Sequence, residues 1–345
     1  MTPEASVRHR TRMVLAFATI YLIWGSTYLA IIFAIRSIPP FLMAGARFLL
    51  AGAGLYLYAR LRGGRRPTRS QWGWAALLGA LFFLIGNGVV VYVEQFMASG
   101  LTALLIAMVS VWTALLEWAR PGGSRPTAPV LAGIILGFLG VALLVAPSQL
   151  GGEHVNPVGA ALLMCSSFGW ALASVLSRTA DLPRDIALTS GMEMLTGGIW
   201  LTLASLLTGD WRNFSAAALT AESVLAFLFL LVFGSLVAFT CFAWLLQVTT
   251  ASKVATAGYV NPMVAVLLGW AILGESLSPR SIIASVIIVA SVALIIRGKA
   301  GAGAGGTTAV AAPLPGGQAD AAVSRVSHTH PGGAARVDAG RGTRL

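Results

Sequence analysis

The stretch PPFLMAGARFLLAGAGLYLYAR, residues 39–60, poses the central question of this sequence, because one arginine, Arg47, stands inside a long apolar run. As a helix, the apolar part at 41–59 is long enough to cross a hydrocarbon core of about 30 Å at roughly 1.5 Å per residue. An arginine at the centre of a bilayer costs at least ~2.5 kcal/mol, so Arg47 is expected to face protein or water.

Apolar runs of similar length recur along the chain, which is 57% hydrophobic and only 10% charged. Soluble domains carry about 25% charged residues, so the composition indicates a membrane protein. The first run is too long for the apolar part of a signal peptide and is interpreted as a retained helix. Cys165 and Cys241 fall inside runs and imply no disulfide framework. We predict an all-α polytopic membrane protein with ten transmembrane helices, at residues 13–35, 41–59, 74–93, 98–117, 129–146, 157–176, 186–208, 223–246, 254–273 and 281–296.

The net charge of +11 would suit nucleic-acid binding, but its distribution indicates membrane topology instead. The alternate loops on one side hold only Arg36, Arg212 and Arg280. By the positive-inside rule both termini are then cytoplasmic, in a multi-pass protein of the cell (inner) membrane, and no nucleic-acid partner is expected. The loops and ends on the other side hold Arg8, Arg10, Arg12, Arg60, Arg62, Arg65, Arg66, Arg69, Arg120, Arg125, Arg178, Arg184, Lys253, Arg297 and Lys299.

The composition changes near Gly298 to small residues, glycine and proline, which bury too little surface to offset the entropy of ordering. We therefore divide the chain into a cytoplasmic N-terminus (1–12), a first five-helix half (13–147), a second five-helix half (157–297) and a disordered cytoplasmic tail (298–345). His328 and His330 lie in this tail and are interpreted as solvated, so no metal site is predicted.

The two halves show weak similarity in the same order along the chain. IWGSTYLA (23–30) resembles SFGWALAS (167–174), and the runs at 99–116 and 252–269 resemble each other. MAGARFLLAG (43–52) resembles TSGMEMLTGG (189–198), which pairs Arg47 with Glu193. Because five is odd, the two five-helix halves must be inverted repeats, an arrangement of many secondary transporters whose substrate site lies where the repeats meet.

Three stretches carry a family resemblance: YLIWGSTYLAIIFAIRSIPPFLMAGARFLLAG (21–52), GNGVVVYVEQFMASGLTALLIAMVSVWTALL (86–116) and YVNPMVAVLLGWAILGESLS (259–278). Together they resemble EamA-type proteins of the drug/metabolite transporter superfamily, especially the YedA-like members, over residues 12–297. The resemblance implies bacterial inner-membrane carriers of amino acids or other small metabolites, often exporters. Ser110 stands where the family usually has proline, which leaves a break in the fourth helix undecided, and the first half has no counterpart of Gly274-Glu275.

Arg47 and Glu193 are the main candidate cavity residues. A structural role, in which Arg47 ties carbonyls or a neighbouring carboxylate, stands beside a role in neutralising a substrate carboxylate. With Glu193 at the equivalent depth from the other membrane face, the pair would suit a zwitterionic substrate. Glu94, at the end of the third helix, is either interfacial or part of an outer gate. Glu193 and Glu94 are also the candidates for carrying a coupling proton.

Polar and aromatic residues inside the predicted helices complete the candidate site. Each has a packing role as its alternative, because a lone polar group in lipid normally bonds a neighbouring helix. Asn261 precedes Pro262, which removes one backbone hydrogen bond and frees a carbonyl. The candidates for a substrate wall or contact are Asn87, Trp24, Tyr28, Trp112, Tyr259 and Asn261.

Other classes of membrane protein fit less well. All histidines lie outside the predicted helices, so neither an HExxH zinc site nor a buried Ser-His pair can form in them, and no GxxxxGK[ST] loop is present. We therefore predict a secondary transporter that needs no cofactor, moves a small-molecule substrate by alternating access and acts as a monomer or homodimer. An uptake permease or channel-like protein is the alternative, and a membrane-embedded enzyme or a receptor follows.

Overall fold

The computed structural model describes residues 3–121, 123, 125–145, 155–249, 254, 257–275 and 278–306, and all contacts discussed below lie in the unit that spans residues 1–304. The regular structure of the described residues is helical throughout. The first half contains α1 (Pro3–Ile35), α2 (Pro40–Leu61), α3 (Arg69–Gly79), η1 (Ala80–Gly88), α4 (Val89–Val93), α5 (Ser99–Ile106), α6 (Val109–Ala119) and α7 (Ala128–Val145). The second contains α8 (Pro157–Leu176), α9 (Ile186–Thr208), η3 (Asp210–Asn213), η4 (Ala216–Ala218), α10 (Ala221–Phe229), η5 (Leu230–Val237), α11 (Ala238–Val248), α13 (Ala257–Leu273) and α14 (Pro279–Gly306).

Eight helices in the described chain are long and apolar enough to cross a membrane. They are the first six and the eighth and tenth of the predicted spans. The ninth is represented by the shorter apolar segment Val260–Leu273. The seventh is α9, whose polar side chains lower its apolarity. Ser190, Glu193 and Thr196 of this helix are all buried, so protein and not lipid surrounds them. With α9 and α13 the ten-helix, all-α fold is confirmed.

Local sequence sets several helix ends. The Thr68 side chain accepts a hydrogen bond from the backbone of Gln71, whose side chain reciprocates, which is a capping box. Asn156 caps α8 ahead of a proline at its first position, and Asp185 caps α9 by accepting a hydrogen bond from the Leu188 amide. Gly209 ends α9 with φ 74°, a left-handed conformation that favours glycine.

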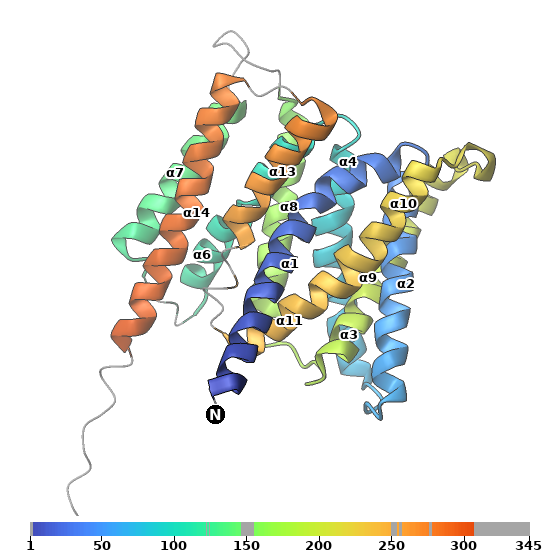
Figure 1. The fold of residues 1–345 in the computed structure, drawn as a ribbon, viewed down its shortest axis with the longest axis horizontal. Helices are drawn as coiled ribbons and strands as arrows, with labels where there is room; N and C mark the ends of the chain where they lie inside the picture. Colours follow the sequence, from blue (N-terminus) through green and yellow to red (C-terminus); the bar gives the residue numbers. More distant parts are fainter. Residues whose placement is uncertain are drawn as a thin grey trace, which may run out of the picture. The chain divides into compact units, whose positions relative to one another are not determined.

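The packing of α2 against α9 shows the inversion of the two halves directly (Figure 1). The helices approach through glycines: a Cβ on Gly52 would lie 2.5 Å from the Leu195 amide nitrogen, and one on Gly198 would lie 2.7 Å from that of Leu49. Gly45 faces the Gly198 end of α9, and Gly52 faces the Gly191 end, so the helices run antiparallel. In the sequence alignment Gly45 corresponds to Gly191 and Gly52 to Gly198. The contact is therefore symmetric about its own centre, as a twofold axis requires.

The neighbouring contacts repeat this symmetry. Helix α2 packs on the π-helix η5 and α9 packs on the π-helix η1, which occupy equivalent places in the two halves. In each π-helix a glycine carbonyl accepts a bond from the first helix of the other half: Trp24 Nε1 donates to Gly234 at 3.2 Å, and Ser166 Oγ donates to Gly86 at 2.6 Å. Such π-turns are rare and frequently occur at functional sites.

The structure resolves one detail of the predicted helices that was left open and corrects another. The fourth span is interrupted at Ala107–Met108, between α5 and α6, although it has no proline there. The Met108 amide donates to the Leu105 carbonyl at 3.2 Å, a tighter turn than an α-helix makes. Helix α14 continues to Gly306, so the beginning of the predicted disordered tail at 298–306 is helical. The rest of that tail, with His328 and His330, lies outside the described residues.

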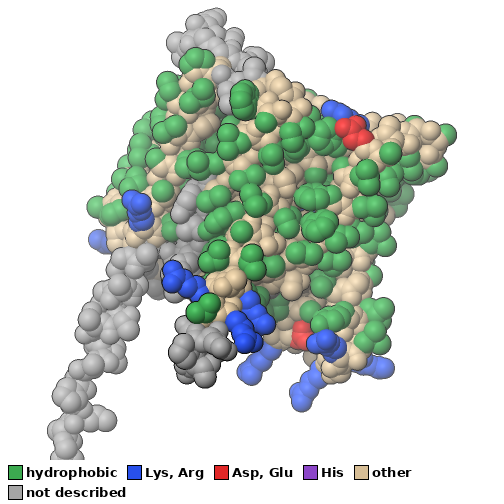
Figure 2. Space-filling model, in the orientation of Figure 1, with side chains coloured by type: hydrophobic (Ala, Val, Ile, Leu, Met, Phe, Trp, Pro, Cys, Tyr) green, Lys and Arg blue, Asp and Glu red, His purple; other side chains and the backbone are tan. Residues whose placement is uncertain are grey.

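The surface in Figure 2 has the distribution that a membrane protein needs. Hydrophobic side chains cover the middle of this face, and most of the basic side chains in view gather at the end where α1 begins. Exposed apolar residues such as Leu207, Leu225 and Val286 are suited to contact with lipid tails.

Candidate functional site

Arg47 is enclosed by protein and does not face lipid. Its side chain is buried, Nε donates to Ser235 Oγ at 2.8 Å, and its guanidinium lies 4.7 Å from the centre of the Phe48 ring. Nη1 has no hydrogen-bond partner among the described residues. Because Ser235 belongs to η5, the arginine joins the first half to the second. The predicted contact with a neighbouring carboxylate is absent from the described ion pairs.

Glu193, the aligned counterpart of Arg47, lies at the other end of the α2–α9 seam. Its side chain is 5% exposed and borders a cavity of about 360 Å³. The carboxylate forms no hydrogen bond or ion pair with the described residues. Arg47 lies at the Gly45–Gly198 end of the seam and Glu193 at the Gly52–Gly191 end, so the two charges flank its centre. The cavity is lined by Phe82, Ser177, Ala180, Leu182, Pro183, Ile186, Thr189, Glu193, Phe239 and Phe242.

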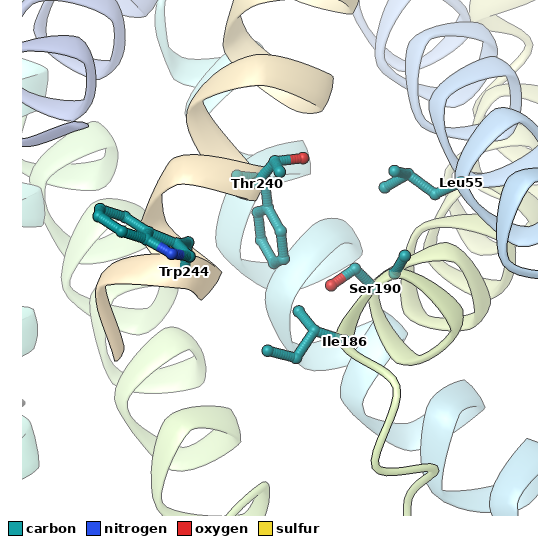
Figure 3. Close-up of a pocket in the computed structure, with 7 residues that line it drawn as sticks. Leu55, Ile186, Ser190, Thr240 and Trp244 are labelled. Carbon is teal, nitrogen blue, oxygen red and sulfur yellow. The ribbon is translucent and has the colours of Figure 1, made fainter. Parts of the chain in front are cut away.

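A second cavity of about 160 Å³ adjoins the first, because Ile186 and Phe239 line both. Figure 3 shows Leu55 of α2 and Trp244 of α11 on its opposite sides, with Ser190 of α9 between them. Residues of both halves therefore border the two cavities: Phe82 and Leu55 come from the first half, and the other lining residues come from the second.

Trp24 and Tyr28 of α1 have different surroundings. Trp24 donates to the Gly234 carbonyl, and its ring lies 5.1 Å from that of Phe242, a wall of the larger cavity. Trp24 thus packs against a lining residue of the larger cavity without lining that cavity itself. Tyr28 is partly buried, packs against the main hydrophobic core and lies within electrostatic reach of Glu94.

Asn87 and Asn261 each hold a side-chain carbonyl oxygen in the interior without a hydrogen-bond partner among the described residues. Asn87 belongs to the π-helix η1, at the position after Gly86, and Ser235 occupies the matching position after Gly234 in η5. Asn261 precedes Pro262 within α13, beside the close approach of that helix to Gly25. Buried polar groups normally have partners, so both oxygens keep an unused capacity to accept a hydrogen bond within the described structure.

Of the two other predicted aromatic residues, Trp112 lies apart from the cavities. Trp112 Nε1 donates to Ser167 Oγ at 3.1 Å, and its ring makes edge contacts with Phe138 and Phe168 at 5.5 and 5.4 Å. These contacts join α6, α7 and α8 and do not reach Glu193. The backbone of Tyr259 belongs to α13, but its side chain lies outside the described part of the structure.

Glu94 and Glu275 meet at the end of the protein where α4 and α13 end. Glu94 is buried with both carboxylate oxygens unpartnered among the described residues, and it lies within electrostatic reach of Glu275. Glu275 accepts bonds from Ser99 N at 2.7 Å, Ser99 Oγ at 2.8 Å and Gly100 N at 3.2 Å. It caps the N-terminus of α5, where a negative charge is stabilised.

Metal-ligating side chains do not cluster in the described residues. The ionisable groups that the fold brings near the seam and the cavities are single carboxylates and one arginine.

Comparison with known proteins agrees with this architecture. Residues 11–146 and 157–297 each match the EamA-like transporter family. The chain is 36% identical over 285 residues to the uncharacterized inner membrane transporter YedA of Escherichia coli K12, covering 82% of this chain and 90% of that protein.

More distant proteins are similar over the same region. The uncharacterized transporter YvbV of Bacillus subtilis is 27% identical, covering 83% of this chain and 92% of its own. A probable amino-acid metabolite efflux pump of Salmonella typhimurium is 24% identical, covering 81% of this chain and 93% of its own. One crystal structure superposes with a TM-score of 0.56 at 21% identity, covering 82% of this chain and 96% of that one, which supports the fold alone.

Proposed function

Because the chain belongs to the EamA-like transporter family, we propose that it is a secondary carrier that exports small metabolites, amino acids or similar solutes, across the inner membrane by alternating access. The observation that carries this proposal is the cavity beside Glu193. It lies where the two inverted halves meet, has a buried carboxylate in its wall, and has a volume in the range of small-molecule sites, about 300–1,000 Å³.

The cavity lies on the cytoplasmic side in the predicted topology. Ser177, Ala180 and Pro183, which line it, belong to the segment between α8 and α9. That segment also contains Arg178 and Arg184, so the positive-inside rule assigns it to the cytoplasm together with both termini. In this assignment the structure is an inward-facing state that takes solute from the cytoplasm.

The opposite side of the seam is closed by bonds between the halves. Arg47 and Trp24 of the first half hold the adjacent Ser235 and Gly234 of η5. Rocking of one half against the other about the α2–α9 seam would exchange the two sides: the Glu193 cavity would close and the region around Arg47 would open. The symmetry of the seam favours such an exchange, because the two arrangements use equivalent contacts.

Coupling to protons is assigned to carboxylates. Glu193 in the cavity wall and Glu94 near the outer end are the candidate proton carriers, since each is buried without a charged partner of opposite sign in the described chain. A proton bound at Glu193 would neutralise the one charge among the described residues that line the cavities.

Transport into proteoliposomes tests the proposal. Purified protein is reconstituted, and a panel of labelled amino acids, amines and small organic acids is screened for flux above that of empty liposomes. A carrier gives saturable flux of at least one solute class that is accelerated by an unlabelled solute on the opposite side. Flux that stays linear with concentration and shows no such acceleration would instead favour the channel-like alternative.

A further inference from the structure

The described walls of the two cavities beside Glu193 carry charge of only one sign. Among the described residues that line either of them, Glu193 is the sole ionisable group. Three phenyl rings, those of Phe82, Phe239 and Phe242, form much of the remaining wall of the larger cavity. These described walls offer one negative charge and aromatic surface, and they hold no cation to match a substrate carboxylate.

Three described arginines, one on the seam and two next to lining residues in the sequence, do not supply that cation. Arg47 lies at the other end of the seam, where Ser235 and Phe48 hold its guanidinium, and it lines neither cavity. Arg178 follows the lining residue Ser177, but its Nη1 is engaged at 2.8 Å by Glu117. Arg184 follows the lining residue Pro183 and is exposed at the surface.

From these observations we propose that the Glu193 cavity binds the ammonium group of a small monoamine with an apolar or aromatic body, and selects against solutes that also carry a carboxylate. This inference rests on the carrier function proposed above and narrows its substrate class. The pairing of Arg47 with Glu193 in the sequence suggested a zwitterionic substrate. The inferred substrate differs because Glu193 lines the cavity and Arg47 does not.

The ammonium group of such a ligand matches Glu193, and its apolar or aromatic body matches the phenyl rings of the cavity wall. A buried carboxylate attracts an ammonium strongly, and phenyl faces add cation–π attraction of about 0.5–2 kcal/mol. The rings are held in place: Phe82 makes an edge contact with Trp170 at 5.0 Å, and Phe239 lies 6.0 Å from Phe242. The adjoining cavity between Leu55 and Trp244 gives the apolar body room to extend (Figure 3).

A carboxylate on the same ligand meets the opposite conditions. It would lose its hydration in a largely apolar cavity, find no cation and experience repulsion from Glu193. Phenethylamine and phenylalanine differ only by this carboxylate, which makes them a matched pair of probes for the proposal.

The experiment measures equilibrium binding of these probes to the full-length protein in nanodiscs by isothermal titration calorimetry. We expect phenethylamine to bind at least about tenfold more tightly than phenylalanine. Glu193→Gln should weaken phenethylamine binding at least about tenfold, whereas the same change at the distant surface residue Glu222 should leave it unchanged. Tighter or equal binding of phenylalanine by the native protein would overturn the proposal, and so would amine binding that is unaffected in a folded Glu193→Gln protein.

A second variant keeps the test independent of the folding of Glu193→Gln. Ser177→Lys adds an ammonium to the lining of the cavity, on the segment between α8 and α9, and should shift the preference from phenethylamine toward phenylalanine. An unchanged preference would contradict the inference. The proteoliposome screen separates this inference from the carrier function. Saturable exchange of phenylalanine but not of phenethylamine would refute the amine selectivity and leave the carrier intact, whereas no flux of any solute would count against the carrier itself.

Discussion

The glycine seam between α2 and α9 should not tolerate even one methyl group. A Cβ on Gly52 would lie 2.5 Å from the Leu195 amide nitrogen, whereas ordinary contacts begin at 3.4 Å. The helices would therefore have to separate locally by about 0.9 Å, the difference 3.4 − 2.5 Å. The neighbouring atom belongs to a backbone and cannot rotate away. Overpacking of this kind costs about 1–3 kcal/mol.

Gly54 of the same helix supplies the matched control, because nothing lies within 4 Å of a Cβ added there. Both Gly→Ala changes gain helix propensity of about 1 kcal/mol at most, so their difference isolates the steric cost. We expect Gly52→Ala to be less stable than Gly54→Ala by about 1–3 kcal/mol. Reversible unfolding in mixed micelles of increasing sodium dodecyl sulfate content, followed by tryptophan fluorescence, gives this difference.

Symmetry extends the same prediction to the second half. A methyl group added to Gly198, the counterpart of Gly52, would lie 2.7 Å from the Leu49 amide nitrogen, so Gly198→Ala should be destabilised to a similar degree. Equal stability of Gly52→Ala and Gly54→Ala would refute the tight seam. A large effect at Gly52 with none at Gly198 would refute its symmetry.

Three further predictions concern charged residues. Arg47→Leu should abolish transport in proteoliposomes while the protein stays folded, and Arg47→Lys should retain part of it; normal transport by Arg47→Leu would exclude a role in the carrier cycle. Glu275→Gln removes one of the carboxylate acceptors at the N-terminus of α5 and should lower the free energy of unfolding by about 1–3 kcal/mol, which a lower melting temperature would report. An unchanged melting temperature would show that the cap contributes nothing. Arg65→Cys should react with a membrane-impermeant maleimide only from the cytoplasmic side of the membrane, and labelling only from outside would overturn the assigned topology.

Much of the fold follows from the sequence because lipid constrains it strongly. The apolar runs gave ten helices, and the alignment of MAGARFLLAG with TSGMEMLTGG paired the segments that meet in the seam. The resemblance to the EamA family is confirmed by the matches over both halves. The helices, the repeat and the family could be predicted because the evidence for each lies in one continuous segment of sequence or in the similarity of two segments.

The partners of individual side chains were less predictable. Arg47 bonds Ser235, which is 188 positions away, and Glu275 caps a helix whose first residue is 176 positions away. No local pattern specifies such choices, since many serines and helix ends were available. The π-helices were also missed and the break in the fourth helix was left undecided, because none of these segments contains a proline that would mark an irregular turn. All the candidate site residues, Glu193 included, remain predictions to be tested by transport.

Counterflow in proteoliposomes tests the central claim most directly, namely that this protein is a carrier whose site lies between its inverted halves beside Glu193. Vesicles loaded with a high concentration of an unlabelled solute identified by the screen are diluted into a trace of the same labelled solute. The account predicts transient accumulation of label inside vesicles that contain the native protein or the surface variant Glu222→Gln, and none with folded Glu193→Gln protein. Accumulation that persists undiminished in Glu193→Gln, or flux of the native protein without any transient accumulation, would contradict it.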